Sequence, residues 1–291
     1  MAGNLLYLCA SVVLSVGRSM FSKKMACMTP KPGLFFRNQA LLFLSAGLLL
    51  LAGNPDAFSS VSAVTVGYSI AYGLLLIASQ WMYTFAMKLG LTSVCSLIYS
   101  LGFIFPTISG VLFWDEAFTV TNLFGLFLTL TVILLTFRGD AEGVANGRKK
   151  LFLVAILTAM TASGGLGILQ KLQQSSAAAS KETSAFLILA FALAFSASGG
   201  VWLFRRSRER ERVQLSGILP PVFAGLCFGG ANLLNTLLAG RMKSAVFFPI
   251  LNILTILLCT LCGILFFREK LTVKTVLVLL LGMAAVTVLS L

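Results

Sequence analysis

The polar side chains that could bind a ligand recur at fixed spacings inside long apolar stretches. Seven of them can donate or accept hydrogen bonds from such a stretch: Ser79, Gln80, Tyr83, Tyr99, Asn232, Asn235 and Asn252. A shift of 153 residues carries Ser79 onto Asn232 and Tyr99 onto Asn252. Two pairs in the set are three residues apart, so the members of each pair would share one helix face. Hydroxyl and amide groups recognise polar ligands by hydrogen bonding, and tyrosine faces also attract cations. All seven are therefore predicted substrate-binding residues, led by Tyr99, Asn232 and Asn252.

One positive charge, that of Arg18, lies inside the first apolar stretch. A charged side chain at the centre of a membrane helix costs about 2.5–3.5 kcal/mol on insertion scales. We expect Arg18, about one turn inside its helix, to extend toward the cytoplasmic interface; in the alternative it faces the interior and holds a carboxylate or phosphate. Lys171 has the same two alternatives. Arg18 is therefore an eighth candidate for substrate binding.

The alternative role for these polar residues is helix packing. Polar side chains form hydrogen bonds between membrane helices, and each such bond contributes about 0.6 kcal/mol on average. Catalysis is not expected, because the chain contains no His and its apolar stretches contain no acidic pair. Cys259 and Cys262 have a C-x-x-C spacing, but no His or acid neighbours them, so we interpret them as buried apolar residues. We expect no catalytic residues, no metal site and no cofactor.

The composition indicates a membrane protein. Hydrophobic residues make up 58% of the 291 residues and charged residues 11%, and no soluble fold of this length tolerates so apolar a surface. The net charge of +13 comes from basic residues between the apolar stretches rather than on a continuous face, so no nucleic-acid partner is expected. A spanning helix needs about 20 apolar residues. Ten stretches approach or exceed this length: 4–22, 34–53, 61–87, 91–114, 119–137, 151–172, 183–204, 215–240, 245–267 and 271–290.

The two halves of the chain repeat each other. Residues 110–120 read GVLFWDEAFTV and residues 263–273 read GILFFREKLTV, with six identical positions at the shift of 153. A weaker match at a shift of 148 relates the first and sixth stretches. The polar segment 138–150 separates the copies. We therefore predict a first five-helix repeat over 1–137, a linker over 138–150 and a second five-helix repeat over 151–291.

Charge predicts that the second repeat is inverted. The loop GNPDAFSS after the second stretch has no Lys or Arg, whereas its counterpart after the seventh contains RRSRERER. An odd number of helices in each half requires the same inversion. The segments that follow stretches 1, 3, 5, 7 and 9 hold 17 of the 22 basic residues, counting Arg37 and Lys274 at the heads of the next stretches. This predicts that these segments are cytoplasmic and that both termini lie outside.

Taken together, these features resemble the ten-helix, EamA-domain type of the drug/metabolite transporter superfamily. The resemblance spans nearly the whole chain. It is carried by the two five-helix repeats, by Arg37 in FFRNQALLF, by the equivalent residues Glu116 and Glu269 in the short hinges and Ala86 and Ala239, and by Pro106 and Pro249, which are not at equivalent positions. It implies a basket of helices 1–4 and 6–9 around a central cavity, with helices 5 and 10 at the periphery. Four-helix multidrug relatives exchange protons on a Glu in their first helix. Neither stretch 4–22 nor stretch 151–172 contains an acid here.

The sequence thus predicts an inner-membrane carrier with alternating access, acting as a facilitator or exchanger. Its expected partners are a small-molecule substrate and membrane lipids. An amino acid, particularly an aromatic one, is the leading substrate; a choline-like cation is second and a phosphorylated or nucleotide-linked metabolite third. From other classes, a non-transporting membrane assembly or signalling subunit and a lipid-linked-sugar flippase remain as alternatives. The sequence gives no indication of the direction of transport, the coupling ion or the oligomeric state.

Overall fold

The structure is a computed structural model that describes residues 2–27, 32–89, 95, 98–116, 119–137, 149–206, 217–267 and 273–290. These residues are helical apart from short links, and no strand occurs among them. The α-helices are, in chain order, α1 (Ala2–Cys27), α2 (Pro32–Gly53), α3 (Ala63–Leu89), α5 (Ile104–Phe113), α6 (Val120–Phe137), α7 (Lys149–Ser175), α8 (Thr183–Arg206), α9 (Leu219–Arg241), α10 (Ser244–Phe267) and α11 (Val273–Ser290). Short 3-10 turns lie between some of them: η1 (Pro55–Phe58), η2 (Leu101–Phe103) and η3 (Ser180–Glu182).

The surface of the molecule is apolar and part of its interior is polar. Among the described residues, six helices are long and apolar enough to cross a membrane: Gly3–Ser22, Gly33–Gly53, Ala63–Met87, Lys150–Ser175, Ser180–Arg205 and Leu219–Arg241. Shorter apolar helices cover Ile98–Phe113, Val120–Thr131 and Ser244–Leu258. Leu112 and Phe113 are 68% and 73% exposed, whereas Asn38 and Gln39 are buried. Because soluble proteins show the reverse distribution, the chain is an α-helical, multi-pass membrane protein.

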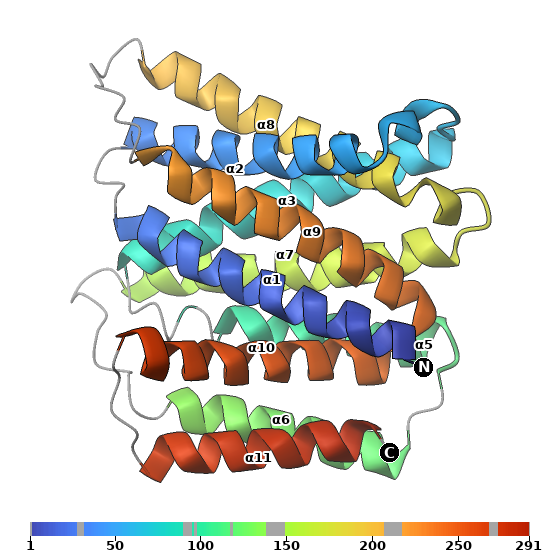
Figure 1. Cartoon of the computed structure of the whole chain (residues 1–291), viewed down its shortest axis with the longest axis vertical. Helices are drawn as coiled ribbons and strands as arrows, with labels where there is room; N and C mark the ends of the chain where they lie inside the picture. The colour runs from blue at the N-terminus through green and yellow to red at the C-terminus, as the bar shows by residue number, and fades with distance from the viewer. Residues whose placement is uncertain are drawn as a thin grey trace.

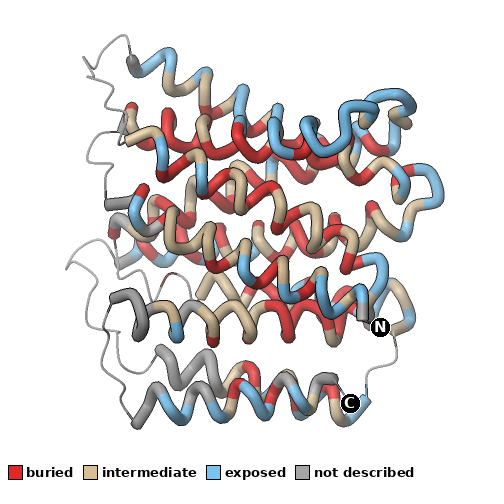
Figure 2. The backbone as a smooth tube through the Cα atoms, viewed as in Figure 1, coloured by how far each residue is buried: buried red, intermediate tan, exposed pale blue. Residues whose placement is uncertain are grey.

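The helices lie side by side in one stack (Figure 1). α1 lies along α9 and α3 along α7, while α2 contacts both α8 and α9. α10 packs on α1 and α5, and α6 and α11 form a pair at one edge of the stack that joins the rest through α10. The largest apolar cluster fills the space between α2, α3, α8 and α9 and includes Phe43, Tyr72, Phe186 and Phe228. Figure 2 shows buried residues concentrated along the central helices and exposed residues along the outer helices.

Glycines permit the closest helix crossing. Gly225 and Gly229 on α9 are four residues apart and face α2. A Cβ added to Gly225 would lie 2.1 Å from the carbonyl oxygen of Leu42, and one added to Gly229 would lie 2.8 Å from that of Ala46. No larger side chain fits at either position unless the two helices separate, so glycine fixes the contact between the first and second halves of the chain here.

The helices agree with the predicted stretches to within a few residues, with two differences that affect the candidate site. α1 continues to Cys27 rather than 22, so Arg18 lies nine residues before its end, about 14 Å along the axis rather than one turn. The stretch predicted as one helix over 91–114 is described at residue 95 and from residue 98 onward. The 3-10 turn η2 interrupts it at Leu101–Phe103, before α5 begins. The predicted linker 138–150 lies almost wholly outside the described residues, as does Glu269.

Candidate functional site

Three buried polar side chains from three helices meet inside the stack. Tyr72 on α3 donates from its hydroxyl to Asn232 Oδ1 on α9 at 2.6 Å. Gln170 on α7 donates from Nε2 to the Tyr72 hydroxyl at 2.9 Å and reaches Asn232 Oδ1 at 3.5 Å. Tyr72 is 0% exposed, Gln170 5% and Asn232 6%. Since buried polar groups must be paired, these bonds determine how α3, α7 and α9 meet.

A second polar group surrounds Tyr99. The hydroxyls of Tyr99 and Ser79 are hydrogen-bonded at 2.9 Å, and either can be the donor. Arg18 on α1 and Ser163 on α7 also lie close to the Tyr99 side chain. The ring of Tyr83 packs on that of Tyr99 with centroids 4.5 Å apart. Tyr99 therefore contacts polar or aromatic groups of α1, α3 and α7 at once.

Arg18 connects the two groups. Its Cζ lies 4.2 Å from the ring centroid of Phe228 on α9 and 6.0 Å from that of Tyr99. Phe228 is only 4% exposed, and its carbonyl oxygen accepts a hydrogen bond from Asn232 Nδ2 at 2.8 Å. Arg18 and Tyr99 both interact electrostatically with Tyr72. The guanidinium thus faces the interior, which is the alternative to the expected position at the cytoplasmic interface.

We call six residues from these contacts the interior polar site: Arg18, Tyr72, Ser79, Tyr99, Gln170 and Asn232. Its elements come from both halves of the chain, with α1, α3 and Tyr99 from the first and α7 and α9 from the second. The site can bind a polar ligand through hydroxyl and amide groups and one cation. Its members contain no His, Cys or carboxylate, so they do not form an acid–base or nucleophilic arrangement.

The other predicted binding residues lie elsewhere or have different partners. Asn235 accepts a hydrogen bond from the Ser11 hydroxyl, which joins α9 to α1. Asn252 donates from Nδ2 to the carbonyl oxygen of Phe248 in its own helix at 2.9 Å. Gln80 is 2% exposed and its Nε2 has no hydrogen-bond partner among the described residues. Tyr83 reaches the interior polar site through its ring contact with Tyr99.

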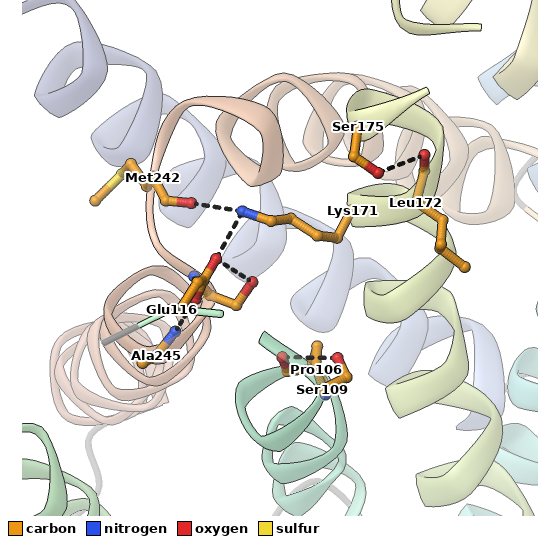
Figure 3. Close-up of polar contacts among 9 residues, drawn as sticks. Pro106, Ser109, Glu116, Lys171, Leu172, Ser175, Met242 and Ala245 are labelled. Atoms are coloured by element: carbon orange, nitrogen blue, oxygen red, sulfur yellow. Dashed lines mark hydrogen bonds and ion pairs between the residues drawn. The ribbon is translucent and has the colours of Figure 1, made fainter. Parts of the chain in front are cut away.

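Glu116, which follows α5, joins the two halves of the chain at one end of the helices, through Lys171 of α7 and the first residues of α10 (Figure 3). Its Oε1 lies 2.8 Å from Lys171 Nζ on α7, and its Oε2 accepts from the Ser244 backbone nitrogen at 2.6 Å. The Glu116 and Lys171 side chains are 8% and 12% exposed. Lys171 also donates to the Met242 carbonyl oxygen at 3.2 Å. Lys171 therefore pairs with a carboxylate at this end and is not a member of the interior polar site.

Glu116 caps a helix of the other half rather than the helix that follows its own hinge. The carboxylate caps α10, a helix of the other half, through the backbone nitrogens of Ser244 and Ala245. A carboxylate at a helix N-terminus is favourable because it complements the helix dipole. Asp115, the preceding residue, has φ of 48°, the left-handed conformation that allows the hinge to turn sharply at this point. At the start of α6, the helix that follows the hinge, the Asn122 side chain accepts a hydrogen bond from the Thr119 backbone nitrogen at 3.1 Å.

A second carboxylate joins the halves at the same end. Glu182 in η3 accepts hydrogen bonds from the Ser62 backbone nitrogen at 3.0 Å and from the Ser62 hydroxyl at 3.0 Å. Ser62 precedes α3 in the first half, whereas η3 precedes α8 in the second. Both chain termini lie at this end as well (Figure 1). We call the contacts of Glu116 and Glu182 the end contacts. Among the described residues, no cluster of His, Cys, Asp and Glu could hold a metal ion.

Comparison with known proteins gives the fold alone. No family model matches the sequence, and no curated protein matches it either. A solved structure, described only as the crystal structure of a protein, superposes with a TM-score of 0.75 over 99% of this chain and 96% of its own, at 16% sequence identity. The whole helical arrangement, not a part of it, therefore occurs in another protein.

Proposed function

We propose that this chain is a membrane carrier of the drug/metabolite transporter type, built from ten spanning helices as two inverted five-helix repeats. The packing of the helices supports the proposal. The repeat relates α1 to α7 at the shift of 148 and α3 to α9 at the shift of 153. Exchanging the halves therefore turns the contact of α1 with α9 into the contact of α7 with α3. Both contacts are extensive. The same operation exchanges α2 with α8 and α6 with α11. The members of each pair contact each other, as a two-fold relation requires.

The observation that carries the proposal is the position of the interior polar site between the halves. Hydrogen bonds from Tyr72 and Gln170 converge on Asn232, and Arg18 of the first half lies over the Phe228 ring of the second. Polar and charged groups inside a membrane protein are costly, and they mark substrate pathways far more often than lipid-facing surfaces. A site made by both halves changes its access when one half rocks against the other.

The end contacts supply the closed end that such a mechanism needs. Glu116 and Glu182 hold the halves together at the end that carries both termini. Breaking these contacts opens that end and requires the opposite end to close. The spanning helices carry no acid for proton exchange, so we propose a facilitator or exchanger. Its substrate is a small polar metabolite, with an amino acid, particularly an aromatic one, as the first candidate, and its location is the inner membrane.

The proposal is tested with the purified protein in two steps. Thermal unfolding is measured with amino acids, choline-like cations and phosphorylated compounds, because a ligand of the folded state raises stability with its concentration. Each stabilising compound is then tested for counterflow in proteoliposomes, with protein-free liposomes as the control. We expect at least one compound to exchange across the membrane. Stabilisation without exchange, or neither across all three classes, contradicts the carrier proposal and favours the assembly subunit or the flippase.

A further inference from the structure

The positive charge of Arg18 has no acidic partner among the described residues. The four described acids, Asp56, Asp115, Glu116 and Glu182, lie between the α-helices, and the ten predicted apolar stretches contain no Asp or Glu. Among the described residues, the ion pair formed inside the molecule is that of Lys171 with Glu116, and Arg18 makes none. Its partners are the aromatic faces of Phe228 and Tyr99. Aromatic rings stabilise a cation by about 0.5–2 kcal/mol, less than the cost of holding it in the membrane.

We propose that Arg18 binds the carboxylate of a substrate that carries a single carboxylate group, so that the substrate itself supplies the missing negative charge. This inference rests on the proposed carrier function. A guanidinium held against a ring still presents its N–H donors at its edge, in a fork that matches the two oxygens of a carboxylate. The Tyr99 hydroxyl lies near the guanidinium and can donate its proton to the ligand when Ser79 is the donor of the hydrogen bond between the two hydroxyls.

The number of charges selects a carboxylate over a phosphate. A phosphate ester carries up to two negative charges and is usually held by several cations. The interior polar site offers one cation, since Lys171 is paired with Glu116. A choline-like cation would meet like charge at Arg18. The neighbouring Tyr72, Gln170 and Asn232 provide neutral hydrogen-bonding groups for the other polar end of the ligand, such as the ammonium group of an amino acid.

The test compares two carboxylates with their amides, with a phosphate ester and with a choline-like cation. Thermal stabilisation of the purified protein is measured with phenylalanine and phenylpropionate, which carry a carboxylate, with their amides, which do not, and with phenyl phosphate and choline. We expect the carboxylates to stabilise the wild-type protein and the amides, phosphate and choline to have little effect. Equal stabilisation by the amides, or no stabilisation by any carboxylate, overturns the inference.

Two variants separate binding from folding. Arg18→Gln should weaken carboxylate binding by about 10- to 100-fold, the loss expected for a charge-assisted hydrogen bond, while the ligand-free protein unfolds at an unchanged or higher temperature because an unpaired charge has been removed. Arg18→Lys keeps the charge without the fork and should retain part of the response. Arg241→Gln is the matched control, because Arg241 also lies over an aromatic ring, 5.1 Å from that of Tyr7, but is exposed at the end of α9. A large loss of stability in ligand-free Arg18→Gln would assign Arg18 a structural role instead.

Counterflow distinguishes this inference from the proposed function. If a carboxylate exchanges equally well in wild type and Arg18→Gln, the chain is a carrier but Arg18 is not its anion site. If carboxylates stabilise the protein through Arg18 and none exchanges, the anion site stands and the carrier proposal fails.

Discussion

At the scale of single residues, the Asn232 side chain makes three hydrogen bonds in and beside the interior polar site. Its Oδ1 accepts from Tyr72 and Gln170, and its Nδ2 donates to the Phe228 carbonyl oxygen. Replacing it with Leu leaves the Tyr72 and Gln170 donors buried with one acceptor fewer. We expect Asn232→Leu to lower the free energy of unfolding by about 1–3 kcal/mol, the cost of unsatisfied buried groups.

The matched substitution is Asn252→Leu, because the Asn252 side chain bonds to its own helix and is less buried. We expect a smaller loss there. Equal losses in denaturant unfolding of the two variants in detergent would show that the Asn232 network adds nothing beyond an ordinary membrane asparagine.

Repeat symmetry finds some of these residues and necessarily misses others. The shift of 153 selects Ser79, Tyr99 and Asn232, because each has a polar residue at its mate. Tyr72 is missed because its mate is Gly225, the residue at which α9 crosses α2. One position in the repeat thus serves hydrogen bonding in one half and close packing in the other. A search limited to paired polar residues cannot detect this division.

At the scale of elements, the cap on α10 comes from the other half of the chain. The Glu116 carboxylate is held by Lys171 and by two backbone nitrogens of α10, with both charged side chains nearly buried. Removing one partner of a buried ion pair is costly, about 3–5 kcal/mol. We expect Glu116→Gln and Lys171→Met each to destabilise the protein, and the double variant to lose clearly less than the sum of the two.

The coupling is measured as a double-mutant cycle by thermal or denaturant unfolding. Glu182→Gln serves as the comparison, because Glu182 joins the same two halves at the same end but no cation pairs with it among the described residues. Its loss should be smaller. Additive effects of the Glu116 and Lys171 substitutions would mean that the short contact contributes no coupling energy.

Hydropathy predicts most helices well, because a span must be continuous and apolar. It does not predict which small residues lie at crossings. Gly229 packs on Ala46 of α2 and Gly230 on Leu14 of α1, whereas a Cβ added to Gly200 on α8 would meet nothing within 4 Å. The pairs 199–200 and 229–230 look alike in sequence. Their difference depends on which face of each helix meets a neighbour, and that is decided by packing across the whole molecule.

At the scale of the whole molecule, both termini lie at the same end of the helices as Glu116 and Glu182, and the distribution of basic residues indicates which side of the membrane this end faces (Figure 1). Of the 22 basic residues, 17 fall where α1, α3, α6, α8 and α10 end or the next helix begins, and those helix ends lie away from the termini. The positive-inside rule then assigns the end contacts to the outer side. In that orientation, the proposed carrier would be closed on the outer side by the end contacts and would receive its substrate at Arg18 from the cytoplasm.

The proposed inverted repeat makes a testable prediction: positions related by the repeat must lie on opposite sides of the membrane. Ser59 follows α2, and the shift of 148 carries it to Ser207, after α8. In a variant without native cysteines, Ser59→Cys should react with a membrane-impermeant maleimide in intact cells, and Ser207→Cys should react only after permeabilisation. Labelling of both residues from the same side would disprove the inversion, and with it the two-fold relation on which the proposed alternating access depends. Labelling of Ser207→Cys alone in intact cells would keep the inversion and reverse the orientation. The end contacts would then close the cytoplasmic side, and the substrate would reach Arg18 from outside.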